Sequence, residues 1–347
     1  MAPVSYTAAP NLASQQKLKV AVVGGGVIGV CSALALQQEF PTAEVTIFSE
    51  KWSPQTTGDV SAGFIYPYAV GEQTPPCLLK RTLADTVQFY ERLIRNPESG
   101  KFGLSLLTMY DLSKEATMAV PSLPELYDVR PMEGAEVAKM FPGYRSGVVA
   151  TTYIAEPTLL LPFLMGKFEG AGGRLVTRKI TALGQLTGDH DLVVNCSGLG
   201  ARYLADVQDL SVEAVRGQVV RVRAPWIRHA VMAGPSYILP NRDCVILGGT
   251  KELANYNLSP DPATAELILR DCAQVVPSLL AAEKIGDFVG LRPYRPSLRI
   301  EADARNRKVI HNYGHGGSGV TLCWGSALEV VKLAKKALGG KGMKSKL

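Results

Sequence analysis

Short apolar runs rich in β-branched residues alternate along this chain with longer segments of helical periodicity. Residues 18–23 form the first apolar run, and residues 30–38 contain good helix formers. A second apolar run covers residues 44–48 and ends in Ser49-Glu50. A strand, a helix and a strand at this spacing predict a βαβ unit.

The alternation continues toward the carboxyl end. Apolar residues recur at Leu79, Leu83, Val87, Tyr90 and Ile94, which predicts a helix over residues 78–96. Further strands are predicted over residues 104–112, 147–154, 174–176, 191–196, 215–222, 236–249 and 308–313, and further helices over 157–168, 262–276 and 321–338. Strand–glycine–helix segments therefore occur near both ends and in the middle, separated by strand-rich blocks.

This order predicts an α/β fold in which a discontinuous Rossmann-type nucleotide-binding domain carries an inserted mixed-β substrate domain. Residues 17–65, 146–205 and 296–340 are assigned to the nucleotide-binding domain, and residues 66–145 and 206–295 to the substrate domain. Residues 1–16 hold no basic residue and no continuous apolar block, so we expect a loose extension there. Residues 341–347 are expected to form a targeting tail.

Gly24, Gly26 and Gly29 follow the first predicted strand in a GxGxxG pattern. The first glycine of such a motif permits the turn, the second lets a pyrophosphate approach the backbone, and the third packs helix against strand. The helix N-terminus then favours the phosphates. Glu50 ends the second strand 21 residues after Gly29, where a carboxylate accepts hydrogen bonds from the adenosine ribose. The pattern predicts a dinucleotide site; an ordinary glycine-rich turn is the alternative.

Two later segments favour a flavin over a nicotinamide dinucleotide. Residues 56–63, TTGDVSAG, form a loop of small residues suited to a pyrophosphate and a flat ring. Residues 311–319, HNYGHGGSG, precede a predicted helix, so their N–H groups form a second anion-favouring site. A flavin needs both sites, because its ring gains negative charge on reduction.

With these segments in place, the chain resembles the D-amino acid oxidase and D-aspartate oxidase family. The matching segments, in the family's order, are VVGGGVIG, TTGDVSAG, VVNCSG, GQVVRV-APW, SYILP, LGGT, GLRPYRP and HNYGHGGSG-TL-WG, and the match spans residue 19 to about residue 335. The resemblance implies an FAD-binding domain and a β-rich substrate domain. It also implies oxidation of a D-amino acid to an imino acid, with hydrogen peroxide formed from molecular oxygen and the imine hydrolysed to a 2-oxo acid and ammonia.

The motifs and the resemblance together predict a set of FAD-binding residues. These are Gly24, Gly26, Val27, Ile28, Gly29, Glu50, Lys51, Thr56, Thr57, Gly63, Ile180, Ser197, Gly198, Gly316, Gly317, Ser318, Gly319, Val320 and Thr321. The predicted catalytic residues are Tyr237, Arg292, Lys251 and Ser318.

Arg292 and Tyr237 match the family residues that bind the substrate α-carboxylate. A planar guanidinium holds a carboxylate through two hydrogen bonds and so fixes the α-carbon for reaction. Arg292 lies in GLRP and Tyr237 in SYILP. The alternatives are a surface arginine beside a turn and a tyrosine that only fills the core of its strand.

Lys251 bears on the choice of substrate. It follows Gly248-Gly249-Thr250. By the family resemblance, this is the position where D-aspartate oxidases carry a cation and neutral-substrate enzymes carry an aromatic residue. A desolvated ammonium there pairs with a second carboxylate, which favours D-aspartate and related acidic D-amino acids. Met232 stands where vertebrate D-aspartate oxidases place another arginine. An exposed Lys251 and a broad neutral D-amino acid oxidase therefore remain the alternatives.

Other functional classes are less favoured but stay open. An NAD-dependent dehydrogenase and a non-catalytic flavin-binding protein both accommodate the glycine motif. The formal net charge is +6, and six lysines in the last sixteen residues account for it, so we expect no nucleic-acid partner. The six cysteines are scattered without metal-ligand spacing, so no metal is predicted. No apolar run approaches the ~20 residues of a membrane span.

The last three residues, Ser345-Lys346-Leu347, match the receptor-read peroxisomal address. They predict import into the peroxisome matrix, with the import receptor as a protein partner beside the substrate and oxygen.

Overall fold

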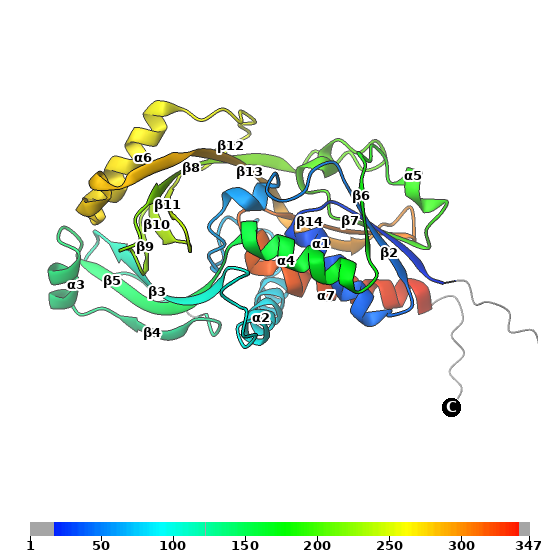
Figure 1. Ribbon diagram of the computed structural model, residues 1–347, viewed down its shortest axis with the longest axis horizontal. Helices are drawn as coiled ribbons and strands as arrows, with labels where there is room; N and C mark the ends of the chain where they lie inside the picture. Colours follow the sequence, from blue (N-terminus) through cyan, green and yellow to red (C-terminus); the bar gives the residue numbers. More distant parts are fainter. Residues whose placement is uncertain (1–16, 122, 340–347) are drawn as a thin grey trace, which may run out of the picture.

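The computed structural model describes residues 17–121 and 123–339, through which one continuous sheet runs from end to end (Figure 1). Its strands are β1 (Lys19–Val23), β2 (Glu44–Ser49), β3 (Leu104–Ser113), β4 (Tyr127–Pro131), β5 (Ser146–Ala155), β6 (Arg174–Thr177), β7 (Leu192–Asn195), β8 (Glu213–Arg223), β9 (Ala230–Ala233), β10 (Ser236–Pro240), β11 (Val245–Gly248), β12 (Glu252–Leu253), β13 (Glu283–Ala302) and β14 (Val309–His315). The main helices are α1 (Val27–Glu39), α2 (Pro76–Leu93), α3 (Gly134–Met140), α4 (Pro157–Gly170), α5 (Gly184–Thr187), α6 (Pro262–Val275) and α7 (Gly319–Gly339).

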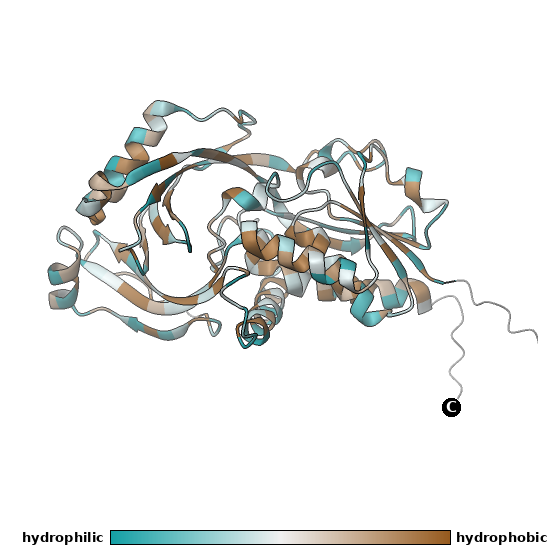
Figure 2. Ribbon diagram, in the orientation of Figure 1, coloured by the Kyte–Doolittle hydropathy of each residue, from teal (hydrophilic) through white to brown (hydrophobic). Residues whose placement is uncertain are grey.

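One half of the sheet is parallel and has helices on it. Its strand order is β14-β7-β1-β2-β6. Val20 and Val22 of β1 pack in a core with residues of α1, α4 and α7, whereas Ala21 and Val23 face a second core on the opposite side. Burial on both faces is why these strands read as continuous apolar runs. Figure 2 shows the same apolar concentration in α1 and α4.

The other half is mostly antiparallel and curved, in the order β4-β5-β3-β9-β10-β11-β8-β13. Side chains on one of its faces pack beneath α6, and those on the other face form a separate core with residues 60–66. Alternation along each strand thus decides which side chains face α6 and which face the interior of the curved sheet.

The long strand β13 joins the two halves. Residues 283–294 pair with β8, and the later residues pair with β14 after a register shift between Tyr294 and Arg299. Pro293 and Pro296 lie at this transition. Proline cannot donate to a ladder and is tolerated at such irregularities.

The α/β fold class and most predicted elements are confirmed, with six omissions among the strands and α-helices: β4, α3, α5, β9, β12 and β13. The predicted strand over 236–249 is wrong as one element, because a turn at Asn241, whose N–H donates to the Cys244 carbonyl, divides it into β10 and β11. The domain boundaries remain a prediction. The boundary at residue 146 assigned β5 to the nucleotide-binding domain, although β5 pairs with β3 and β4.

The predicted extension over residues 1–16 and the targeting tail with Ser345-Lys346-Leu347 lie outside the described residues, so both stay predictions. Among the described helices, none combines the length and apolarity needed to cross a bilayer. The described residues contain no cluster of three His, Cys, Asp or Glu side chains suited to a metal ion.

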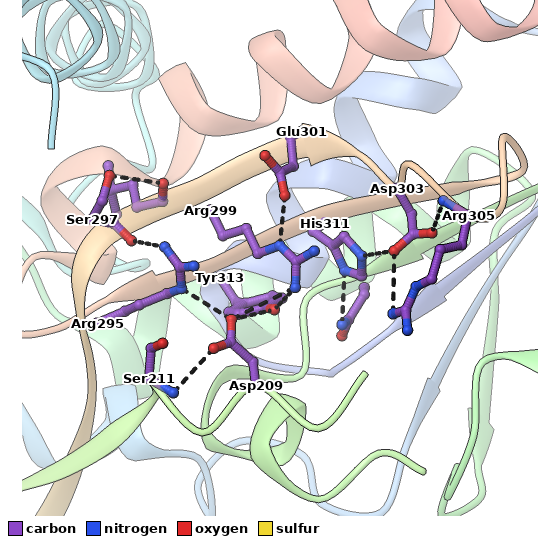
Figure 3. Close-up of polar contacts among 12 residues, drawn as sticks. Asp209, Ser211, Arg295, Ser297, Arg299, Glu301, Asp303, Arg305, His311 and Tyr313 are labelled. Atoms are coloured by element: carbon purple, nitrogen blue, oxygen red, sulfur yellow. Dashed lines mark hydrogen bonds and ion pairs between the residues drawn. The ribbon is translucent and has the colours of Figure 1, made fainter. Parts of the chain in front are cut away.

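Asp209 ties β13 and β14 to the segment before β8 (Figure 3). Its Oδ2 accepts hydrogen bonds from Arg295 Nε at 3.0 Å and from Tyr313 Oη at 2.8 Å. Arg299 Nη1 donates to the same Tyr313 oxygen at 2.6 Å. Burial opposes ionisation of Asp209, but these hydrogen bonds outweigh it and hold its pKa below the ordinary value. The carboxylate therefore stays charged and pins both strands.

A second buried chain links β13 to the end of β7. His311 Nε2 donates to Asp303 Oδ2 at 3.0 Å, and its Nδ1 lies 3.2 Å from Asn195 Nδ2. Asn195 Oδ1 accepts from the Ser197 N–H, which fixes the amide orientation, so Nδ2 donates and Nδ1 carries no proton. Burial lowers the pKa of His311, in keeping with this neutral ring. The chain holds the backbone at Ser197 in place.

The stability contributed by Asp303 is expected to depend on pH. Burial disfavours its charge, but the His311 hydrogen bond and two backbone N–H groups outweigh burial and lower its pKa to about 2. Because the folded pKa is below the unfolded value of about 3.9, this stabilisation is present above pH ~4 and is lost between ~4 and ~2. Urea unfolding should lose about 1 kcal/mol from this group between pH ~5 and ~3. The Asp303→Asn variant should lose that part of the pH dependence; an unchanged profile would contradict the assignment.

Candidate active site

A cavity of about 780 Å³ lies where the two halves of the sheet meet. Glu50 and Lys51 line it from the end of β2, and Tyr237 and Arg292 line it from β10 and β13. Its volume is within the range of ligand sites in proteins. The cavity therefore connects the predicted dinucleotide motif with the predicted substrate residues.

The first glycine motif forms a cradle at the N-terminus of α1. Gly24 has a φ of +119°, and a Cβ on it would overlap the Cys196 carbonyl. A Cβ on Gly29 would overlap the Gly24 carbonyl, so that glycine lets the helix pack against the turn. Gly26 has no protein atom within 4 Å of its Cβ position and no side chain caps the helix there. The backbone at Gly26 thus faces open space, as the approach of a pyrophosphate requires.

The N-terminus of α7 closes another side of the cavity. Gly316 has a φ of +55°, and a Cβ there would overlap the Ala69 carbonyl. The Gly316 N–H donates to the Pro293 carbonyl at 2.9 Å. The turn is therefore pressed between residues 68–69 and β13, with the start of α7 aimed at the cavity. A helix N-terminus favours negative charge at such a place.

The structure brings most of the predicted cofactor residues together. Those that line the cavity are Gly24, Gly26, Val27, Ile28, Glu50, Lys51, Thr56, Thr57, Gly63, Ile180, Ser197, Gly198, Gly316, Gly317, Gly319, Val320 and Thr321. Gly29 is not among the lining residues and has the packing role just described. Glu50 is exposed and pairs with Lys179 Nζ at 3.4 Å.

The prediction of Ser318 as a catalytic and cofactor-binding residue differs from the structure. Its side chain is buried and does not line the cavity. Its Oγ accepts from the Tyr68 N–H at 2.7 Å and donates to the Tyr68 carbonyl at 2.8 Å. Both hydrogen bonds of the hydroxyl go to backbone, so the Ser318 side chain connects the segment at Tyr68 to the start of α7.

Arg292 has its guanidinium fixed from three sides. Its Nη1 donates to the Thr250 carbonyl at 3.0 Å, and its Cζ lies 5.5 Å from the centre of the Tyr68 ring. A Cβ on Gly217 would overlap the guanidinium, so only glycine lets it lie flat against β8. The remaining N–H groups face the cavity that Arg292 lines. The arginine is thus placed to receive an anion.

Tyr237 lies beside this arginine with its ring across Gly248 and Gly249. A Cβ on Gly249 would stand 2.7 Å from the Tyr237 hydroxyl oxygen. Burial raises the pKa of Tyr237, and the nearby Arg292 offsets this only in part. The phenol therefore stays protonated at neutral pH and donates to whatever anion Arg292 holds.

The prediction of Lys251 as a pocket residue also differs from the structure. Lys251 is exposed and is not among the cavity-lining residues. The Tyr294 hydrogen bond is the main cause of a lowered pKa at Glu72, and Lys251 adds a weaker attraction. Lys251 therefore lies at the surface, as the alternative left open by the sequence has it.

Several lining residues escaped sequence reasoning. Phe64, Tyr66 and Tyr68 approach the cavity from the loop after residue 63, and Leu258 from the loop after β12. The aromatic spacing in FIYPY was a usable signal for the first three. Gly217 was visible only as a glycine in a strand, which marks a close approach of another group.

Comparison with known proteins adds three findings. A family model described as FAD dependent oxidoreductase matches residues 19–333. Human D-aspartate oxidase is 38% identical over 92% of this chain and 95% of that protein, and D-amino acid oxidase of Dugesia ryukyuensis is 35% identical over 92% and 98%. The glycine oxidase structure from Geobacillus kaustophilus superposes with a TM-score of 0.76 at 21% identity, over 92% of this chain and 95% of that one, and shows the likeness of fold.

Gly26→Val should abolish FAD retention without unfolding the chain. The backbone at Gly26 is extended (φ −79°, ψ 177°), so valine is tolerated locally, but its side chain enters the open space before α1. The measurement is FAD per chain after purification, with circular dichroism to report folding. Gly166→Ala, on α4 with nothing near its Cβ position, is the matched control. A fully flavinylated Gly26→Val protein would contradict the cradle.

Proposed function

This chain belongs to the family of FAD dependent oxidoreductases, and from that premise we propose that its cavity oxidises D-amino acids whose side chains carry no second carboxylate. The relatives named D-aspartate oxidase and D-amino acid oxidase support the D-amino acid substrate. The observation that carries the proposal is the pair of Arg292 and Tyr237, which face the same cavity as the glycine cradles.

The residues present fit FAD. Glu50 and the backbone at Gly24–Ile28 would hold the adenosine and pyrophosphate, because both line one end of the cavity and the helix end favours phosphate. The loop from Thr56 to Gly63 and the start of α7 would hold the ring. Bound FAD supplies the acceptor for the two electrons of the substrate and passes them to molecular oxygen, giving hydrogen peroxide.

Arg292 binds and orients the substrate through its α-carboxylate. Thr250 takes one of its N–H groups, so the remaining fork meets the carboxylate in a fixed plane. Tyr237 donates to the same carboxylate. Two fixed donors leave the α-carbon one orientation, which is the main contribution that the protein makes to such a reaction.

The protonation state of the substrate amine is not set by a carboxylate of the cavity wall. Among the described residues, no Asp or Glu side chain lines the cavity beside Tyr237 and Arg292. Burial lowers the pKa of His315 to about 3, so that ring is neutral. The substrate amine therefore reacts in its neutral form, and its ammonium group loses the proton to solvent before the substrate binds.

The walls near Tyr237 are apolar. Val219, Met232, Leu239 and Phe64 line the cavity there. These side chains exclude water from the reacting centre. They also suit the aliphatic part of a substrate side chain, because no cation other than Arg292 is among the described lining residues of the substrate half.

D-Aspartate oxidation is the second candidate, and the 38% identity with human D-aspartate oxidase favours it. A second carboxylate would have to meet Lys251 at the exposed surface. A solvated ion pair contributes only ~0–1 kcal/mol, so the geometry gives D-aspartate a small advantage at most.

Arg292→Lys should lower kcat/KM for D-alanine about 30- to 150-fold with FAD retained. An ammonium cannot reproduce the paired hydrogen bonds, and losing a charged hydrogen bond costs about 2–3 kcal/mol. Oxygen uptake with D- and L-alanine is the assay. Arg223→Lys, an exposed arginine paired with Glu283, is the control and should behave as wild type. Unaltered kinetics in Arg292→Lys would remove this residue from the site.

Lys251→Met should change kcat/KM for D-aspartate by no more than about fivefold, as expected of a solvated ion pair. Wild-type activity on D-aspartate, D-glutamate, D-alanine and D-methionine completes the comparison. A preference for D-aspartate that Lys251→Met removes by tens-fold, with D-alanine unaffected, would establish the second candidate instead.

A further inference from the structure

The loop of residues 56–63 lies between the cavity and the curved half of the sheet. Val60, Ser61 and Ala62 line the cavity. Asp59, in the middle of the loop, is buried and is not among the lining residues. Because this loop is one of the segments that would hold the flavin ring, the contacts on its buried side also bear on the position of the ring.

Two side chains of the curved half hold backbone carbonyls of this loop. Arg221 Nη2, from β8, donates to the Asp59 carbonyl at 2.6 Å. Asn241 Nδ2, from the turn between β10 and β11, donates to the Ala62 carbonyl at 3.0 Å. The two carbonyls are three residues apart and enclose the part of the loop that lines the cavity. The curved half therefore fixes the backbone of this part.

The Arg221 guanidinium is held flat. Its Cζ lies 4.4 Å from the centre of the Phe288 ring on the neighbouring strand β13. Stacking on an aromatic face fixes the plane of a guanidinium. Within residues 17–121 and 123–339, Arg221 Nε is buried without a hydrogen-bond partner. An unpaired buried donor lowers stability, so the contact with the loop is what the arginine adds over an apolar residue of similar length.

Asn241 is held through its neighbour. The Arg242 N–H donates to Glu156 Oε1 at 2.7 Å, and Glu156 is only 8% exposed. The residue before Glu156 is Ala155, whose N–H donates to the Gly63 carbonyl at 2.8 Å. The turn that carries Asn241 and the end of the loop are thus fastened to adjacent residues of the chain.

The strands that hold the loop also carry the carboxylate site. On β8, Gly217 lies under the Arg292 guanidinium, and Arg221 follows four residues later. On β10, Tyr237 lies beside Arg292, and Asn241 follows four residues later in the turn. Two paths through the same sheet therefore connect the carboxylate donors with the loop.

We propose that Arg221 and Asn241 are positioning residues for FAD, which hold the loop of residues 56–63 and so set the distance between the flavin ring and the substrate α-carbon. Neither residue lines the cavity, so both act through the loop. The part that concerns FAD depends only on the family of the chain. The part that concerns the α-carbon rests on the proposed function.

The first test measures FAD affinity without turnover. Arg221→Met and Asn241→Leu each remove one donor to the loop and keep a side chain of similar length. Each should raise the Kd of FAD about five- to tenfold, as expected from the loss of one hydrogen bond. The FAD-loaded protein is diluted, and released flavin is read from its fluorescence. Arg223→Met, at an exposed arginine of the same strand, is the matched control and should leave Kd unchanged.

A conservative variant separates the hydrogen bond from packing. Arg221→Lys keeps a donor for the Asp59 carbonyl but loses the flat stacking on Phe288. It should raise the Kd of FAD by no more than about threefold. The FAD-free forms of all variants should unfold at temperatures close to that of the FAD-free wild type, because the contact acts on the loop and not on the core.

The second test separates kcat from KM. With FAD in excess, Arg221→Met and Asn241→Leu should lower kcat for D-alanine about tenfold and leave KM nearly unchanged, because Arg292 and Tyr237 still hold the carboxylate while the loop displaces the ring. The visible absorption maxima of the bound flavin should shift in both variants. The Arg223→Met control should match wild type in all three measurements.

Three results overturn the inference: Kd values of both variants equal to that of Arg223→Met, a loss of FAD affinity in Arg221→Lys as large as in Arg221→Met, or a fall in FAD affinity that only parallels a fall in the unfolding temperature. Arg221 and Asn241 lie on different elements, so if one variant fails to fold, the other still tests the loop. Failure of the proposed function has a separate signature: the wild type consumes no oxygen with any D-amino acid, while the Kd values for FAD still report on the loop.

Discussion

The hydrogen bond from the Gly316 N–H to the Pro293 carbonyl fixes the distance between the two functional ends of the molecule. Pro293 follows Arg292 on β13, and Gly316 precedes the helix that faces the cavity from the other half. Backbone pairing of Tyr294 with His315 extends the same link. The carboxylate-binding arginine and the flavin-binding loop are thus placed by backbone geometry, which side-chain motion cannot relax.

Buried polar chains then hold this junction rigid. Asp209 pairs with Arg295 and Arg299, two half-buried arginines of β13 beside β14, and Asp303 holds a neutral His311 behind the loop at Ser197. Removing one member of such a chain leaves a buried group unsatisfied. Side chains also bond backbone groups of β13 at the register shift: Arg295 Nη1 donates to the Ser297 carbonyl at 2.8 Å, and the Leu298 N–H donates to Thr74 Oγ1 at 3.1 Å.

Substrate choice depends on which side chains share a face with Tyr237. In sequence, Lys251 and Met232 draw attention because they occupy positions where related enzymes differ. In the folded chain Lys251 is solvated, whereas Met232 forms part of the cavity wall because β9 pairs with β10 and places Met232 beside Tyr237. A one-residue slip in either β9 or β10 would turn its side chain away from the cavity.

Local chemistry was enough to predict much of this protein. Strands buried on both faces show as apolar runs, helices as apolar stripes, and a glycine motif between strand and helix has one main use, so the nucleotide half and most of its cavity residues follow from the sequence. The arginine and tyrosine of the substrate half followed from the resemblance. Sequence reasoning did not predict β13, because its glycines, prolines and charged residues are not typical of a strand and it is stabilised only by pairing with β8 and β14.

Only the tertiary structure determines which side chains are buried and which ones face the cavity. Ser318 and Lys251 are polar residues in segments that match the family. In the structure the Ser318 hydroxyl is hydrogen-bonded to the Tyr68 backbone, and Lys251 is exposed to solvent. Gly217 reads in sequence only as a glycine within a strand. Its place under the Arg292 guanidinium comes from the pairing of β8 with β13, two strands far apart in the chain, and long-range register is set by the packing of the whole sheet.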